Sequence, residues 1–434
     1  MKSLPGGALI RSGRFAKAGM STGGNYLRHY LGNSLPIKNL HQDKRTLNRK
    51  NAVSIFKELS QLRGLPLKLA QGMSMDTGLL PIEFLEVMSS AQYNVPPMNR
   101  ALVRTQFKRN FSEYPENIFK TFDYDAFAAA TIGQVHHATN SNGVRVAVKV
   151  QYPNVRKSIN SDLKLLSIFG KQFFKGKNFE KYLDEVRDTL IEETDYLNEG
   201  LNIQKFRNII SSKEIIIPEY QESTSNEQVL TMTFLEGEHL DQMLKKEPDQ
   251  NIKNNYGQIM WNFFHENINS SNNTFHADVH PGNFLFCEEG KLGVIDFGCI
   301  KIFPDQFIKS CIRLVQKHLN GSHQEFQKEL ECLGFIKNVS DLSSKEEKIE
   351  KLFSNLAKIL GSIYDKPVFD FGNKKFREDL NILLQNAMQI REVRGSEQFI
   401  FFNRITFGLM SILMKLEAKI ETSEARGIIL NADC

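Results

Sequence analysis

Two short motifs near the middle of the chain carry residue types that suit phosphoryl transfer. The first is His276-Ala-Asp278, followed by Asn283, and the second is Asp296-Phe297-Gly298, which directly follows the apolar run 292–295. Transfer of a phosphoryl group from ATP needs one carboxylate to orient the nucleophile, and an amide oxygen and a second carboxylate to hold magnesium. The order H-x-D-x-x-x-x-N and then D-F-G supplies these groups. The spacing therefore predicts a nucleotide site with Asp278 as the catalytic carboxylate and Asn283 and Asp296 as Mg²⁺ ligands; the alternative is a loop whose Asp and Asn serve only its turns.

A strand, a turn and a second strand precede these motifs. The pattern predicts strands over 136–138 and 144–150 joined by the turn 140–143, and the second strand carries Val-Ala-Val-Lys149. In kinases the lysine of such a strand contacts the α- and β-phosphates. A lysine at the end of a strand is more often simply solvated, so the interpretation depends on the two motifs that follow.

The segments on either side of this hairpin are expected to enclose the nucleotide. Residues 128–131 stand where a conventional kinase has a glycine-rich loop, and alanine there keeps the N–H donors but loses access to positive φ. The runs 215–217 and 229–235 predict further small-lobe strands, the second ending where a kinase hinge offers backbone groups to adenine. The expected nucleotide-binding residues are Ala128, Ala129, Ala130, Thr131, Val135, Ala147, Lys149, Thr233, Phe234 and Leu235.

Helical periodicity dominates the remaining chain. Helices are expected over 51–62, 67–75, 99–110, 153–210 with a break near 175–178, 254–267, and from 298 to about 420. The acidic helix from Phe179 is predicted to continue through Glu199, and its Glu193 is the candidate partner that holds Lys149 toward the phosphates. Lys68 and Gln71 share one helix face, for which solvation is the default explanation.

Composition bounds the class of protein. The 434 residues, 41% hydrophobic and 24% charged, are enough for two to three lobes of a folded protein. No apolar run of about 18 residues occurs and no secretory signal pattern opens the chain, so neither a transmembrane helix nor a signal peptide is expected. The five cysteines form no C-x-x-C pair, which favours reduced thiols in a cytoplasmic protein and argues against a zinc site.

The amino-terminal segment is strongly basic. Residues 1–50 carry ten Lys and Arg against the single acidic residue Asp43, a charge of +9 (10 − 1), whereas the whole chain has a net charge of +5. Apolar residues among these charges predict an amphipathic arm on an anionic membrane surface. A disordered tail, or a segment docked on the protein's own acidic surface, fits the composition equally well. Nothing in the chain resembles a base-reading motif, so nucleic acid is not an expected partner.

A second Asp-Phe-Gly occurs at 370–372. It follows Lys366-Pro367 instead of an apolar strand and has no H-x-D…N motif upstream, so we predict a structural loop. No A-P-E segment follows the first Asp-Phe-Gly. Without that segment a docking platform for a protein substrate is not expected.

Together these stretches resemble the UbiB, or AarF-type, family of atypical kinase-like proteins, from about residue 10 to residue 420. The similar segments are FAAATIGQVHHA (127–138), VAVKVQYPNV (146–155), ETDYLNE (193–199) and HADVHPGN (276–283). In the last segment Val279 stands where the family usually has proline. KLAQ (68–71) resembles the family motif K-x-G-Q, with Ala70 in place of glycine.

The resemblance implies an N-terminal helical extension folded over the site where a kinase would seat its substrate. It implies that Lys68 and Gln71 project into the nucleotide pocket, with Gln71 near Glu193, and that Asp195 and Glu199 belong to the family's acidic helix motif. It further implies binding of ATP or ADP with Mg²⁺, ATPase activity stimulated by membranes, and a role in polyprenyl quinone synthesis. Anionic membrane lipids and quinone-biosynthesis enzymes are then the expected partners, and the expected location is the cytoplasm or the membrane surface. Because Ala70 is still a small residue, the K-x-G-Q motif is expected to work.

The expected fold class is α+β, a two-lobed protein-kinase-like fold with an N-terminal helical extension and a helical C-terminal tail. Its expected parts are a basic arm (1–50), the extension (51–118), an N-lobe with inserted helices (119–236) and a C-lobe with the tail (237–434). The expected function is that of an ATP-hydrolysing atypical kinase. The alternatives are a small-molecule or protein kinase, and a nucleotide-gated scaffold for membrane enzymes in which catalysis is dispensable.

Overall fold

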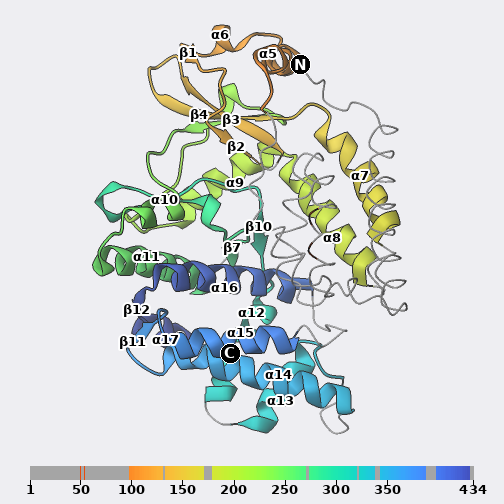
Figure 1. Cartoon of the computed structure of the whole chain (residues 1–434), viewed down its shortest axis with the longest axis vertical. Helices are drawn as coiled ribbons and strands as arrows, with labels where there is room; N and C mark the ends of the chain where they lie inside the picture. The colour runs from red at the N-terminus through yellow and green to blue at the C-terminus, as the bar shows by residue number, and fades with distance from the viewer. Residues whose placement is uncertain are drawn as a thin grey trace, which may run out of the picture. The chain divides into compact units, whose positions relative to one another are not determined.

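The computed structural model describes residues 97–130, 132–170, 178–269, 273–319, 322–337, 343–387 and 397–430, together with Arg49 and Val53. The predictions for the basic arm and for the helices around Lys68, Ala70 and Gln71 lie outside these residues, as does Thr131. The chain divides into two compact units, Met1–Gly200 with Tyr220–Phe234, and Leu201–Glu219 with Leu235–Cys434. Figure 1 labels the elements of both units.

The first unit is built on a five-stranded antiparallel sheet in which β1-β3-β4-β6 are neighbours and β2 also pairs with β3. Its strands are β1 (Thr121–Phe122), β2 (Ala128–Ala129), β3 (Gly133–Thr139), β4 (Arg145–Gln151) and β6 (Val229–Thr233). The turn from β3 to β4 is closed by Asn140, whose side-chain oxygen accepts hydrogen bonds from the N–H groups of Asn142 (3.0 Å) and Val144 (2.9 Å). The hairpin predicted over 136–150 is confirmed.

Helices flank this sheet in the sequence. They are α5 (Arg100–Phe111), α6 (Pro115–Ile118), α7 (Val155–Gly170), α8 (Asn178–Glu193) and α9 (Tyr196–Ile209), the last of which continues into the second unit. The prediction that one helix runs through Glu199 was wrong, because the chain turns at 194–195 and a new helix begins. The carboxylate of Asp195 accepts the N–H of Asn198 at 3.0 Å, which is an N-cap contact and explains why the helix restarts there.

Among its described residues, the second unit contains three small sheets. They pair β7 (Thr274–His276) with β10 (Ile300–Ile302), β8 (Phe284–Phe286) and β5 (Ile215–Ile216) with β9 (Leu292–Val294), and β11 (Val368–Asp370) with β12 (Lys419–Glu421). The strand expected at 215–217 is present, but its assignment to the small lobe was wrong. It pairs in parallel with β9, where the N–H of Leu292 donates to the carbonyl of Glu214 at 2.8 Å. The alternation of side chains predicts a strand but not its partner.

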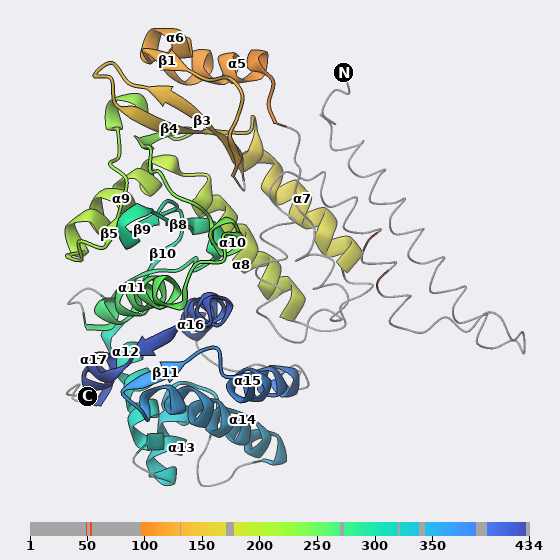
Figure 2. The ribbon, with the colours of Figure 1, turned by 60° about the vertical axis from the view of Figure 1, so that its left-hand side comes forward.

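Helices make up most of the second unit, namely α10 (Leu240–Lys245), α11 (Gln250–Asn269), α12 (Asp305–Leu319), α13 (His323–Cys332), α14 (Ser344–Gly361), α15 (Lys374–Ala387), α16 (Glu397–Leu416) and α17 (Ser423–Leu430). Short 3₁₀ turns in the two units are η1 (Glu222–Thr224), η2 (Pro281–Asn283), η3 (Glu288–Gly290) and η4 (Ser362–Tyr364). Helices α11 and α16 pack side by side (Figures 1 and 2). Near them the rings of Phe264, Phe275 and Phe402 pack with centroids 5.8–6.3 Å apart, which ties β7 to both helices.

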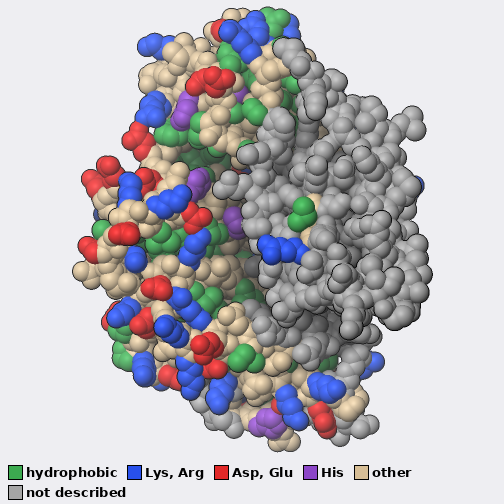
Figure 3. All heavy atoms as spheres, in the orientation of Figure 1, with side chains coloured by type: hydrophobic (Ala, Val, Ile, Leu, Met, Phe, Trp, Pro, Cys, Tyr) green, Lys and Arg blue, Asp and Glu red, His purple; other side chains and the backbone are tan. Residues whose placement is uncertain are grey.

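The surface of the described residues carries both signs of charge. Figure 3 shows Lys and Arg interspersed with Asp and Glu over the described part of the face in view. Among the described helices, none combines the length and the apolar character needed to cross a bilayer.

Candidate active site

The histidine of the H-A-D motif binds the second motif directly. His276 ends β7 opposite Ile300 of β10, and its Nε2 donates to the carbonyl oxygen of Asp296 at 2.5 Å. The N–H of Ala277 donates to the carbonyl of Cys299 at 3.0 Å. Because both contacts link the segment after β7 or its last residue to the segment before β10, the H-A-D and D-F-G motifs are held together within one unit.

The aspartate and the asparagine of the first motif contact each other. The side-chain nitrogen of Asn283 donates to the carbonyl of Asp278 (2.8 Å) and to its carboxylate Oδ2 (3.1 Å). The N–H of Asn283 donates to the carbonyl of His280 at 2.9 Å, which closes the turn between them. Since the amide nitrogen of Asn283 is used inside the loop, its oxygen is the atom left to face a cation.

The Asp-Phe-Gly turn is fixed from two sides. The N–H of Gly298 donates to Oδ1 of Asp296 at 3.0 Å, and the fully buried ring of Phe297 packs 5.4 Å from that of Phe206. The side chain of Asn202 on α9 donates to the carbonyl of Phe297 at 3.0 Å. These contacts leave Asp296 half-buried beside a rigid turn.

The predicted ligand set fits magnesium. An amide oxygen of Asn283 and the carboxylate of Asp296 are hard oxygen donors, and Mg²⁺ is commonly held by one or two carboxylates with phosphate and water oxygens completing its shell. Among the described residues, no group of three or more His, Cys, Asp or Glu side chains could hold a metal without such help. A Mg²⁺ ion held by these two residues would therefore need phosphate oxygens of a nucleotide to complete its shell.

Lys149 in the first unit pairs with a different glutamate from the one predicted. Its Nζ lies 2.9 Å from both carboxylate oxygens of Glu199, with 10% of the lysine side chain and 2% of the glutamate side chain exposed. Glu193 was therefore the wrong choice: it ends α8, whereas Glu199 lies on the first turn of α9. The side chain of Gln151 donates to the carbonyl of Thr194 at 2.7 Å and so anchors this helix junction to β4.

The alanine-rich segment is partly engaged in its own turn. Ala128 and Ala129 form β2, and the N–H of Ala130 donates to the carbonyl of Gly133 at 3.0 Å. A side chain at Gly133 would approach the carbonyl oxygen of Val150 to 2.4 Å, so only glycine fits at this crossing. The expectation that residues 128–131 cap the phosphates therefore requires donors other than the N–H of Ala130.

An aromatic cluster at the end of the sheet was missed by the sequence analysis. The rings of Phe127 and His137 stack with centroids 3.9 Å apart, and Phe234 packs edge-on against His137 at 4.8 Å. Successive residues of a strand alternate between faces, so His137 lies on the same face of β3 as Val135, and the period of two could have revealed it. The N–H of Phe234 donates to the carbonyl of Arg145 at 3.0 Å, so that hinge donor is already used.

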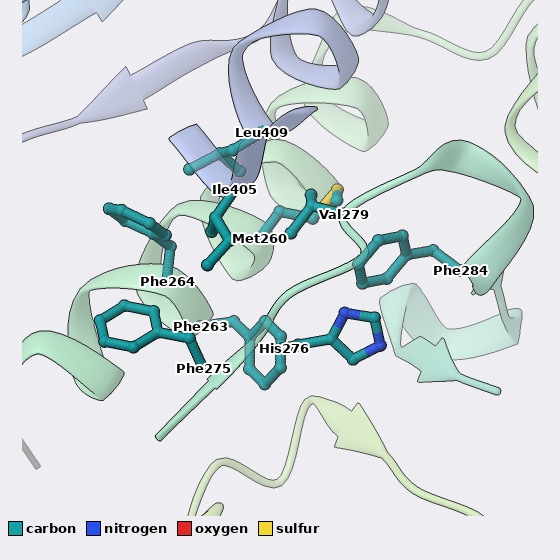
Figure 4. Close-up of a pocket in the computed structure, with 9 residues that line it drawn as sticks. All are labelled: Met260, Phe263, Phe264, Phe275, His276, Val279, Phe284, Ile405 and Leu409. Atoms are coloured by element: carbon teal, nitrogen blue, oxygen red, sulfur yellow. The ribbon is translucent and has the colours of Figure 1, made fainter. Parts of the chain in front are cut away.

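The loop of Asp278 also contacts α16, far along the chain. Arg404 donates through Nη2 to Oδ1 of Asp278 at 2.5 Å, a contact that the sequence analysis did not anticipate. Figure 4 shows Ile405 and Leu409 of the same helix facing Val279 and other side chains around a small apolar cavity. The cavity measures ≈ 10 Å³, near the least room that admits a single water, so the side chains around it pack closely against the loop.

The second Asp-Phe-Gly has the same local turn in a different setting. The N–H of Gly372 donates to Oδ1 of Asp370 at 2.7 Å, and Phe371 is fully buried. Its carbonyl accepts a hydrogen bond from Nε of Arg377 at 3.0 Å. This turn ends β11, which pairs with β12, and it serves the packing of the C-terminal region.

Burial affects the thiols of two cysteines in the second unit. Burial raises the pKa of the Cys287 thiol, which follows β8, and that of Cys311 on α12 above their usual range. Thiols held protonated are poor nucleophiles.

Comparison with known proteins places this geometry in context. A family model described as the ABC1 atypical kinase-like domain matches residues 90–330. The chain is 26% identical over 399 residues to a probable serine/threonine-protein kinase, abkA, of Dictyostelium discoideum, covering 86% of this chain and 69% of that protein. It is 26% identical over 389 residues to the mitochondrial atypical kinase coq-8 of Caenorhabditis elegans, covering 86% of this chain and 50% of that protein. The chain thus spans only half the length of the second relative.

A solved structure shares the fold. The complex of Rv3197 with erythromycin from Mycobacterium tuberculosis matches with a TM-score of 0.63 and 23% identity, covering 88% of this chain and 96% of that one. The expected kinase-like fold of mixed helices and sheets is confirmed by this likeness and by the family match.

Proposed function

The chain belongs to the ABC1 atypical kinase-like family, and from that premise we propose that it binds ATP with Mg²⁺ and hydrolyses it in support of polyprenyl quinone biosynthesis. The observation that carries the proposal is the connection of the two motifs in one unit. His276 holds the backbone of Asp296 while Asn283 holds Asp278. A loop with only a structural role would not require the carboxylates of Asp278 and Asp296 and the amide of Asn283 to be held close together.

Each residue has a distinct task in the proposed reaction. Lys149, kept in place by the carboxylate of Glu199, binds the α- and β-phosphates. Asp278 orients the attacking water, or a small hydroxyl acceptor, and takes up its proton. Asn283 and Asp296 would hold Mg²⁺, which when bound neutralises charge on the phosphates.

The quinone and membrane parts of the proposal rest on the family resemblance. The relative coq-8 is named an atypical kinase, and the ten basic residues of the segment 1–50 supply positive charge for an anionic lipid surface. Anionic lipids are therefore proposed to stimulate hydrolysis, and enzymes of quinone synthesis are the proposed partners.

The test is phosphate release from ATP by the purified full chain, with and without anionic liposomes. We expect Asp296→Asn to lower turnover by at least about 100-fold, because it removes the charge that holds the metal. The matched control is Asp370→Asn at the second Asp-Phe-Gly, which should keep turnover within about twofold. Asparagine forms the same kind of turn as aspartate, so both variants should fold.

Three outcomes would decide against parts of the proposal. Full turnover by Asp296→Asn would refute the magnesium assignment. Equal turnover with and without anionic liposomes would refute the proposed stimulation by membranes. Nucleotide binding without any phosphate release, combined with rescue of a quinone-deficient strain by Asp278→Asn, would favour the scaffold.

A further inference from the structure

The catalytic aspartate has an ion-pair partner outside the segment matched by the family model. That match ends at residue 330, whereas Arg404 lies on α16. Nη2 of Arg404 is 2.5 Å from Oδ1 of Asp278, and 13% of the arginine side chain and 12% of the aspartate side chain are exposed. A charge-assisted hydrogen bond in such a setting is stronger than one between neutral groups.

The two oxygens of Asp278 are held by one residue of the same loop and by one residue far away in the sequence. Oδ1 accepts from Arg404 and Oδ2 accepts from Asn283 at 3.1 Å. Two donors on two different oxygens fix the rotation of the carboxylate, which a single donor would leave open. A general base depends on such orientation, because it must lie within hydrogen-bond reach of the proton that it takes.

Helix α16 is itself held firmly against the loop. A side chain at Gly408 would come within 2.3 Å of the carbonyl oxygen of Val279, so helix and loop are in backbone contact one turn away from Arg404. Ile405 and Leu409 pack into the apolar layer beneath the loop (Figure 4). The guanidinium therefore projects from a rigid support, which is what a positioning group requires.

We propose that Arg404 is a positioning residue for Asp278, so that α16 forms part of the active site. The proposal rests on the proposed function, since it assumes that Asp278 acts as the base. Arginine suits the task because it stays charged and its planar group presents several donors in a fixed geometry. Lysine should restore only part of the function of Arg404, because its ammonium group is a single point charge without a fixed planar set of donors.

The experiment compares Arg404→Met and Arg404→Lys with the unchanged chain in steady-state ATP hydrolysis. We expect Arg404→Met to lower kcat by about 10- to 100-fold, the effect typical of partners that orient a site's own groups, while the KM for ATP changes by less than about twofold. Arg404→Lys should recover part of kcat. In an Asp278→Asn background, Arg404→Met should have no further effect, because it acts through the aspartate.

Arg313→Met is the matched control for loss of a half-buried arginine. Nε of Arg313 lies 2.8 Å from the carboxylate of Glu329, and the two side chains are 18% and 13% exposed, close to the values of the Arg404 pair. This variant should lower the unfolding free energy without changing kcat per folded molecule. Urea unfolding of every variant gives the fraction of folded molecules, by which each measured kcat is divided.

Several results would overturn the proposal. Unchanged or increased kcat in Arg404→Met would refute positioning, and an increase would identify the pair as a restraint on the aspartate. A rise in KM that accounts for the whole loss would assign Arg404 to nucleotide binding. Absence of phosphate release by the unchanged chain would overturn the proposed function and this proposal together, whereas normal release by both the unchanged chain and Arg404→Met would overturn this proposal alone.

Discussion

Replacing Gly408 by alanine should disturb the loop of Asp278, although alanine is the better helix former. Gly408 lies in the interior of α16, and an ordinary exposed helical glycine changed to alanine gains about 1 kcal/mol of stability. Here the added Cβ would meet the carbonyl oxygen of Val279 at 2.3 Å and the Cβ of Val279 at 3.1 Å. The carbonyl belongs to the backbone and cannot rotate away, so the helix and the loop have to separate.

The size of the effect follows from the overlap. Ordinary van der Waals contact begins near 3.4 Å, so a separation of about 1.1 Å (3.4 − 2.3) is needed. Overpacking of this kind costs about 1–3 kcal/mol. We take the upper part of that range because the clash is with backbone, and after the gain in helix propensity the net loss of unfolding free energy is about 1–2 kcal/mol. A displacement of about 1 Å at a catalytic group lowers the rate by up to about 100-fold.

Urea unfolding and phosphate release measure the two effects. Gly257→Ala on α11 is the control, because its Cβ would clash at 2.5 Å with the Cβ of Ala418 and not with the loop of Asp278. We expect both variants to lose stability and only Gly408→Ala to lose kcat. Our reasoning would be refuted if Gly408→Ala were stabilised by about 1 kcal/mol like an exposed helical glycine, or if it kept full turnover.

Two further predictions concern buried titratable side chains. Glu199→Gln should lower ATP turnover by at least about 10-fold, because the ion pair with Lys149 must be in place for phosphoryl transfer, whereas Glu193→Gln should lower it less; equal effects in a phosphate-release assay would contradict the assignment. Burial lowers the pKa of His265 to about 4, so the folded protein keeps it neutral while the unfolded chain takes up a proton below its ordinary pKa of 6.5. The contribution of the neutral His265 to the free energy of unfolding is therefore complete above pH 6.5. It is lost as the pH falls toward 4, by up to about 3 kcal/mol. In urea unfolding at pH 7.5 and pH 5, His265→Gln should show a smaller pH dependence than the unchanged chain, and equal slopes would rule the effect out.

Local structure around the candidate site was the part that the sequence predicted well. The hairpin with Lys149 and the motifs around Asp278 and Asp296 are short patterns in which spacing and turn residues determine the structure. The pairing of β7 with β10, which joins the two motifs, was not predicted, because β8 and β9 lie between these strands in the sequence.

The charged partners of Lys149 and Asp278 escaped prediction for identifiable reasons. In the sequence, Glu193 and Glu199 look like members of one acidic helix. In the structure they lie on two helices, and Asp195 caps the start of the second. An aspartate directly before a helical segment is a known start signal, but the continuous helical periodicity of this stretch concealed it. Arg404 lies 126 residues from Asp278, and no local pattern specifies which distant side chain a folded loop will meet.

The two Asp-Phe-Gly turns in this chain show how little a tripeptide decides by itself. Each closes with its glycine N–H on its own aspartate, and each buries its phenylalanine completely. They differ in their neighbours, since His276 binds the carbonyl of Asp296 and joins that turn to the loop of Asp278. A search for the three letters would return both turns, although only the first follows an H-x-D…N motif. For the same reason, Asp-Phe-Gly grafted onto another fold should form a well-packed turn. A histidine placed like His276 would still be needed to join that turn to a second loop.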